Sequence, residues 1–149
     1  MAEHDLFAND VGTWDATISI RPGPGAPEQR STGAVTNRLV GGRWLVVDFK
    51  NETGFEGHGV FGWDETRKAY VGTWVDPMRT FMTVMVGEYD PATRTMTYDA
   101  EAQMPDGRAL HWREVTERVD DDTHRYRQLW ALPGGEHEMM TITYRRRKG

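Results

Sequence analysis

The feature that most constrains this chain is a two-residue alternation of apolar and polar side chains in short runs, separated by turn-forming residues. The run 12–20 is typical, because Trp14 and Ile18 alternate with Asp15 and Thr17. Successive side chains of a β-strand point to opposite faces, whereas a helix repeats every 3.6 residues. The alternation therefore predicts half-buried strands along nearly the whole chain.

Turn residues divide this pattern into ten expected strands. They are residues 12–20, 33–40, 43–50, 58–64, 69–76, 80–89, 94–103, 108–118, 123–133 and 136–146. Only residues 3–11 favour a helix, since Phe7 and Val11 lie four apart and Gly12 follows. Residues 21–31 carry three prolines and are expected to form the longest loop.

Short connections make neighbouring strands antiparallel, and closing a ten-stranded meander removes its exposed edges. The expected fold is therefore an all-β, ten-stranded up-and-down barrel with a short N-terminal helix, formed as one domain over residues 1–149. A barrel of this size can hold one small ligand.

Composition excludes several classes of function. The chain has no cysteine, so disulfides, thiolate catalysis and cysteine-bound metals are ruled out. Its 18 Lys+Arg against 23 Asp+Glu give a net charge of −5, which argues against nucleic-acid partners. No apolar run approaches the roughly 20 residues of a membrane span, and the acidic start does not resemble a signal peptide. These observations favour a cytoplasmic protein without membrane partners.

The histidines and serines do not form a known catalytic or metal-binding pattern. Ser19 and Ser31 are the only serines, and they lie on an expected solvent face and in the proline-rich loop. No pair of histidines has the spacing of a metal site; they are His4, His58, His111, His124 and His137. We therefore expect no metal and no cofactor.

Hairpin parity indicates which side chains face the interior, because directly opposed residues share a face. Strand 94–103 has a clear apolar face that includes Met96 and Tyr98. If the Asp106-Gly107 turn has an even number of residues, His111 and Arg113 face the interior of the barrel. An ionised guanidinium in an apolar interior needs an anionic or carbonyl-bearing partner.

The same reasoning extends to the neighbouring hairpins. If the turn at 120–122 is also even, Tyr126 and other residues of strand 123–133 face the same interior. Aromatic residues of segments 58–64 and 69–76 share one further face of the sheet. The resulting candidate ligand-binding residues are Arg113, Tyr98, Gln128, Trp130, Met85, Trp74, Phe81 and Trp63. A few polar groups in an apolar cavity are typical of a ligand pocket.

One alternative stays open, namely that a bulge reverses the parity. His111 and Arg113 would then face solvent, and Trp112 would lie in the core. Under the first parity, an outward apolar stripe is expected that is compatible with a homodimer. Its members are Leu110, Trp112, Leu129 and Ala131.

Several segments resemble the bacterial DUF1579 family over nearly the whole chain. They are Gly41-Gly42-Arg43-Trp44-Leu45, Phe55-Glu56-Gly57-His58-Gly59, Gly62-Trp63-Asp64, residues 70–78, Gly87-Glu88-Tyr89-Asp90 and residues 140–146. The opening Gly12-Thr13-Trp14 is similar to the start of lipocalin-like (calycin) barrels. The resemblance implies a lipocalin-like barrel in which Arg145 or Arg146 stacks on Trp14, and it implies no defined chemistry.

Four functions are compatible with these observations. The leading hypothesis is a barrel that binds a small hydrophobic or aromatic molecule. The alternative is a biosynthetic cyclase or isomerase in which His111 or Tyr126 performs acid–base catalysis. A lesser alternative is a nitrobindin-like haem barrel with His111, or secondly His137, as the iron ligand. A filled barrel that serves only as an interaction module is the remaining possibility.

Two carboxylates could assist acid–base chemistry only if they faced the interior. They are Asp48 and Glu114. Asp48 is expected to face solvent, and the first parity also places Glu114 outside, beside Trp112.

Overall fold

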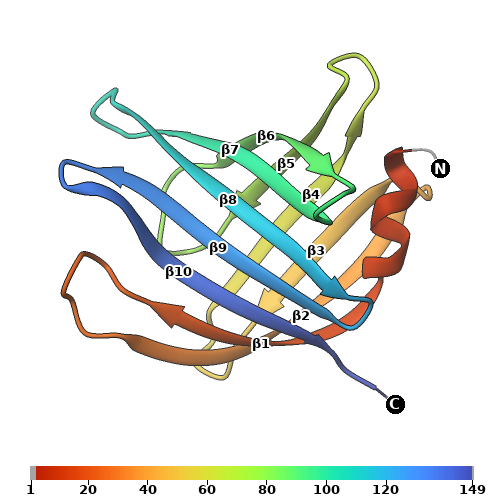
Figure 1. Ribbon diagram of the computed structural model, residues 1–149, viewed down its shortest axis with the longest axis horizontal. Helices are drawn as coiled ribbons and strands as arrows, with labels where there is room; N and C mark the ends of the chain where they lie inside the picture. Colours follow the sequence, from red (N-terminus) through yellow and green to blue (C-terminus); the bar gives the residue numbers. More distant parts are fainter. Residues whose placement is uncertain (1–2, 149) are drawn as a thin grey trace.

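The computed structural model describes residues 3–148 and shows a closed antiparallel barrel of ten strands (Figure 1). Each strand pairs with its neighbours in the chain, and β1 pairs with β10 to complete the ring. The elements are η1 (Glu3–Asp10), β1 (Gly12–Ile20), β2 (Gln29–Val40), β3 (Trp44–Lys50), β4 (Glu56–Asp64), β5 (Ala69–Val75), β6 (Thr83–Asp90), β7 (Thr95–Gln103), β8 (Ala109–Asp120), β9 (Thr123–Leu132) and β10 (Gly135–Arg146). The expected fold class is confirmed.

The main difference in strand boundaries is at β2. It begins at Gln29, inside the segment expected to be a loop, and Gln29 pairs with Ile20 of β1. The last proline of that segment is Pro27, so every later residue has the backbone N–H that a sheet requires. The loop is therefore shorter than the sequence predicts, and the β1–β2 ribbon is longer.

The N-terminal helix lies across one end of the barrel and is a 3₁₀ helix (Figure 1). The hydroxyl of Tyr70 donates to the carbonyl oxygen of Glu3 at 3.0 Å. At the other end of the helix, the indole Nε1 of Trp14 and the amide Nδ2 of Asn37 both donate to the carbonyl oxygen of Asp10, at 2.9 and 3.0 Å. These bonds attach η1 to β1, β2 and β5, so this end of the barrel is covered.

The C-terminal strand is anchored at the same end. The Arg146 guanidinium lies 4.3 Å from the centre of a Trp14 ring and donates to the carbonyl oxygen of Val11 at 2.8 Å. A guanidinium over an aromatic face is a favourable cation–π arrangement. The arginine–tryptophan contact implied by the resemblance is thus present, and Arg146 makes it.

The parity assumed for the β7–β8 turn was wrong. Tyr98 pairs with Glu114 and Ala100 pairs with Trp112, so even-numbered residues of both strands share the interior face. The cause is an odd turn, in which the N–H of Met104 donates to the carbonyl oxygen of Arg108 at 2.7 Å and leaves three residues in the loop. Trp112 is consequently buried, and His111 faces solvent.

A second irregularity restores the expected orientation of β9. The β8–β9 pairing shifts by one residue between Arg118 and Asp120, which is a β-bulge. Glu114 then lies opposite Gln128, and Thr116 lies opposite Tyr126. The interior placement of Tyr126 and Gln128 is therefore correct, because two errors of parity cancel.

The outward apolar stripe expected for a homodimer is not formed. Trp112 is buried inside the barrel, and Leu110 shares its face and packs against the same core. Leu129 points outward but is 7% exposed, and only Ala131 is open to solvent. The alternative placement, with Trp112 in the core and His111 and Arg113 toward solvent, describes this side of the barrel, although an odd turn and not a bulge reverses the parity.

Candidate functional site

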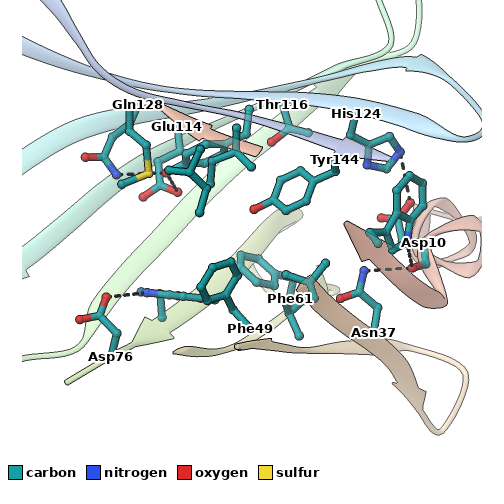
Figure 2. Close-up of a pocket in the computed structure, with 18 of the residues that line it drawn as sticks. Asp10, Asn37, Phe49, Phe61, Asp76, Glu114, Thr116, His124, Gln128 and Tyr144 are labelled. Atoms are coloured by element: carbon teal, nitrogen blue, oxygen red, sulfur yellow. Dashed lines mark hydrogen bonds and ion pairs between the residues drawn. The ribbon is translucent and has the colours of Figure 1, made fainter. Parts of the chain in front are cut away.

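The barrel encloses a cavity of about 370 Å³ (Figure 2). This volume is within the range of small-molecule sites. Most of its walls are rings and aliphatic side chains, and the aromatic members are Phe7, Trp14, Phe49, Phe55, Phe61, Trp74, Tyr98, Tyr126 and Tyr144. Polar groups lie beneath η1, on the wall formed by β8 and β9, and in connecting segments that include Asn51, Asp76 and Arg79.

A buried ion pair lies beneath η1. Arg118 donates from both terminal nitrogens to the two carboxylate oxygens of Asp10, at 2.5 and 2.8 Å. Their side chains are only 9% and 8% exposed. Asp10 is the last residue of η1 and Arg118 lies near the end of β8, so the pair joins the helix to the far part of the chain.

His124 is next to this pair. Its Nε2 is 3.8 Å from a carboxylate oxygen of Asp10, and its ring centre is 4.5 Å from that of Trp14. Burial lowers the pKa of His124 to about 4, and the positive charges of Arg118, Arg146 and Arg94 add to this effect against the attraction of Asp10. The imidazole is therefore neutral at neutral pH.

The β8–β9 wall carries a hydrogen-bond chain with a defined direction. The indole Nε1 of Trp130 donates to the side-chain oxygen of Gln128 at 2.8 Å, and the amide nitrogen of Gln128 donates to the hydroxyl oxygen of Tyr126 at 3.1 Å. Tyr126 then donates to Glu114 Oε1 at 2.8 Å. Trp112 Nε1 donates to the other carboxylate oxygen, also at 2.8 Å. An indole N–H can only donate, so both ends of the chain direct hydrogens toward Glu114.

The carboxyl group of Glu114 is nevertheless without a paired cation among residues 3–148, since it takes part in no ion pair there. Burial raises the pKa of Glu114, and the hydrogen bonds from Tyr126 and Trp112 and the charge of Arg79 only partly offset this effect. Burial and the charge of Glu114 also raise the pKa values of Tyr126 and Tyr144, whose hydroxyls stay protonated at neutral pH.

Four buried polar atoms have no hydrogen-bond partner within the described residues. They are Asn37 Oδ1, Thr83 Oγ1, the Tyr98 hydroxyl and Arg118 Nε. Every one of these residues lines the cavity. Buried polar atoms without partners are uncommon in proteins, because each costs about 1–3 kcal/mol. The four unpartnered atoms therefore all belong to residues around this one cavity.

Four of the residues selected from the sequence line the cavity: Trp74, Tyr98, Tyr126 and Gln128. Four others are packed in or against the neighbouring core: Trp63, Phe81, Met85 and Trp130. The stacked Trp112–Trp130 pair, with ring centres 4.6 Å apart, supports the wall from which Glu114 projects.

Two further selected residues lie outside the barrel, and their expected placement was wrong. Arg113 is 46% exposed and forms a surface ion pair with Glu136 at 2.5 Å. His111 is also exposed. The guanidiniums that line the cavity are those of Arg79, from the β5–β6 loop, and Arg118. Both errors follow from the odd β7–β8 turn, which reverses the two faces of β8.

Polar cavity-lining residues that the sequence reasoning did not select include Asp10, Arg79, Glu114 and His124. Glu114 was placed outside by the wrong parity, so knowledge of the turn length would have found it. Arg79 lies in a loop and Asp10 at a helix end, where strand periodicity gives no information. Asp48 faces solvent as expected and pairs with His58 at 2.7 Å.

The haem alternative loses both histidines on which it depended. His111 is exposed, and the Nε2 of His137 is 2.6 Å from the carbonyl oxygen of Arg21, away from the cavity. Within residues 3–148 there is also no group of three or more His, Cys, Asp or Glu side chains suited to hold a metal ion. Over the same range, no helix is long and apolar enough to cross a membrane.

Comparison with known proteins supports the fold and the family. The structure is similar to the crystal structure of Rv2717c from M. tuberculosis, with a TM-score of 0.69 and 13% sequence identity over 99% of each chain. This likeness shows a shared fold. No match is found among the curated proteins. The family model described as "Protein of unknown function (DUF1579)" matches residues 1–146, and the chain therefore belongs to the DUF1579 family.

Proposed function

We propose that this protein binds a small, largely apolar organic molecule in the barrel cavity, with polar groups on the β8–β9 wall orienting it. The observation that carries the proposal is the combination of a cavity of about 370 Å³ with buried polar atoms on its walls that no described residue satisfies. A core built only for stability would be packed without such a void.

The geometry also supports an oriented ligand. Aromatic side chains such as Phe49 and Phe61 face Tyr144 across the cavity, while Glu114 and Gln128 lie toward one side (Figure 2). An apolar molecule with one polar end would place its apolar part among the rings and its polar end against β8 and β9.

Replacing Thr116 with phenylalanine is expected to weaken binding by filling part of the cavity. Thr116 lines the cavity on β8, so the larger ring would occupy the ligand's space without removing a charged group. We expect the affinity for a neutral hydrophobic dye, phenylnaphthylamine, to fall about tenfold or more, the loss of roughly 1.4 kcal/mol. Dye fluorescence, with energy transfer from the tryptophans, measures this change.

Thr17→Phe is the matched control, because Thr17 is an exposed residue of β1. It should leave dye affinity unchanged, and circular dichroism should show both variants folded. Unchanged dye binding by a folded Thr116→Phe protein would contradict the proposed site. No dye binding by the wild-type protein would contradict the proposed function itself.

A cyclase or isomerase is the second candidate, and the contact between Tyr126 and Glu114 favours it. A buried carboxyl group with a raised pKa, bonded at 2.8 Å to a tyrosine hydroxyl, suits proton transfer to or from a bound carbonyl compound. His111, the other residue considered for this role, is excluded by its exposed position. Exchange of the α-hydrogens of bound cyclohexanone for solvent deuterium, lost in Tyr126→Phe, would support an enzyme.

A further inference from the structure

Glu114 has hydrogen bonds but lacks a counter-charge. Each of its carboxylate oxygens already accepts a hydrogen bond, from Tyr126 and from Trp112. Both of these bonds come from neutral donors, whereas a positive charge would offset the cost of burying the carboxylate. Arg79 meets this need only in part: its charge acts on Glu114, but its guanidinium lies 5.4 Å from the centre of a Trp112 ring and forms no ion pair among the described residues.

A count of the charged groups around the cavity also indicates that one carboxylate has no matching cation. The described residues that line it include three carboxyl groups, on Asp10, Asp76 and Glu114, and two guanidiniums, on Arg79 and Arg118. Asp10 and Arg118 neutralise each other. Neither Asp76 nor Arg79 forms an ion pair among residues 3–148, and the charge of Arg79 only partly offsets the buried Glu114 carboxylate, so the lining has one more carboxyl group than guanidiniums. The charges of the lining residues balance when the cavity contains one additional cation or when Glu114 takes up a proton.

We infer that the ligand carries a protonated amine, which binds the Glu114 carboxylate while the aromatic rings hold the apolar remainder. An ammonium group has three donors and no acceptor, and aromatic faces attract it. Tyr144 reaches into the cavity, and its hydroxyl has no hydrogen-bond partner among the described residues, so it offers a further acceptor (Figure 2). This inference rests on the proposed function and specifies its ligand class.

The test compares three probes of the same chain length at neutral pH: n-octylamine, n-octanol and n-octanoate. Each probe displaces phenylnaphthylamine from the wild-type protein. We expect octylamine to bind about tenfold more tightly than octanol, and octanoate to bind most weakly. Equal affinities for octylamine and octanol, or tighter binding of octanoate, would overturn the inference, and the latter would identify Arg79 as the anchor.

Glu114→Gln should remove the advantage of octylamine over octanol, so that the two probes bind within about twofold of each other. Glu117→Gln is the matched control, since Glu117 lies on the same strand with its side chain exposed. A persistent preference for octylamine in Glu114→Gln would overturn the inference while leaving the proposed function intact. If neither the dye nor octanol binds the wild-type protein, the proposed function fails as well.

A pH titration of the wild-type protein provides a test that does not depend on the folding of a variant. Lowering the pH protonates Glu114, so the affinity for octylamine should fall by about the factor that separates it from octanol, whose affinity should stay constant. The other ionisable groups near Glu114 are Tyr98 on β7, Tyr126 on β9, Tyr144 on β10 and Arg79 of the β5–β6 loop. They keep their protons as the pH falls, because burial raises the pKa values of the three tyrosines and a guanidinium is always charged. His124 lines the same cavity and has a pKa of about 4, so the affinities are compared above that pH. A pH-independent preference would contradict the role of Glu114.

Discussion

Replacing Asp10 with alanine is expected to lower the free energy of unfolding by about 4 kcal/mol, the cost of breaking one buried ion pair. The variant would leave the Arg118 guanidinium, 9% exposed, without its two charge-assisted bonds. Arg118 Nε already lacks a partner among the described residues, so the guanidinium would keep none of its hydrogen bonds. The midpoint of chemical denaturation, monitored by tryptophan fluorescence, measures the loss.

Glu136→Ala is the control for this prediction. Glu136 forms an ion pair of the same length with Arg113, but the two side chains are 50% and 46% exposed. Solvent screens such pairs, so the cost should be within about 1 kcal/mol. Equal effects of the two replacements would show that Asp10 and Arg118 do not form the buried pair described above. Replacing both Asp10 and Arg118 with apolar residues should cost less than Asp10→Ala, because no unpaired charge would remain.

Strand number, order and closure could be predicted from the sequence because they depend on a repeated pattern. Each strand contributes several alternating positions, so an error of one or two residues at its end does not change the fold. The boundary error at β2 illustrates this tolerance: residues 29–32 extend a ribbon that was already expected. The aromatic face shared by Phe61, Tyr70 and Trp74 was predicted in the same way, and their register confirms it.

The site was harder to predict because it depends on single residues in turns. One residue more or less in a turn reverses which face of the next strand is inside. The three-residue loop after Met104 moved Arg113 to the surface and brought Glu114 into the cavity. The bulge near Arg118 then reverses the faces a second time. The interior placement of Tyr126 and Gln128 was therefore correct, but for the wrong reason. Periodicity contains no information about either irregularity.

The sequence predicted a guanidinium in the apolar interior, and the structure shows why the correct arginine could not be identified from the sequence. Arg118 faces the cavity because the even-numbered residues of β8 point into the barrel. Its partner Asp10 comes from a helix more than a hundred positions earlier in the chain. Arg79 reaches the cavity from the β5–β6 loop. Such contacts arise from tertiary placement and leave no local pattern.

Acidification is expected to destabilise the protein through His124. The pKa of this imidazole is about 4 in the folded state, against 6.5 for the unperturbed group. As the pH falls below 6.5 the unfolded chain binds a proton that the folded chain does not bind. The stabilisation is therefore complete above pH 6.5 and declines until the pH reaches about 4. At about 1.4 kcal/mol per pH unit, the total loss is about 3 kcal/mol.

The variant His124→Phe isolates this effect, because phenylalanine keeps a ring against Trp14 but cannot take up a proton. The difference in free energy of unfolding between the two proteins should change with pH only between 6.5 and about 4, and in the direction that favours the variant at low pH. Glu114 does not produce the same result, since its raised pKa makes the folded state bind a proton first and so opposes acid destabilisation. Parallel pH profiles for wild type and variant would mean that His124 is protonated equally in the folded and unfolded chains, and that the cavity beneath η1 is open to water. A steeper wild-type profile would instead show that this end of the barrel excludes water, as a site for an apolar ligand requires.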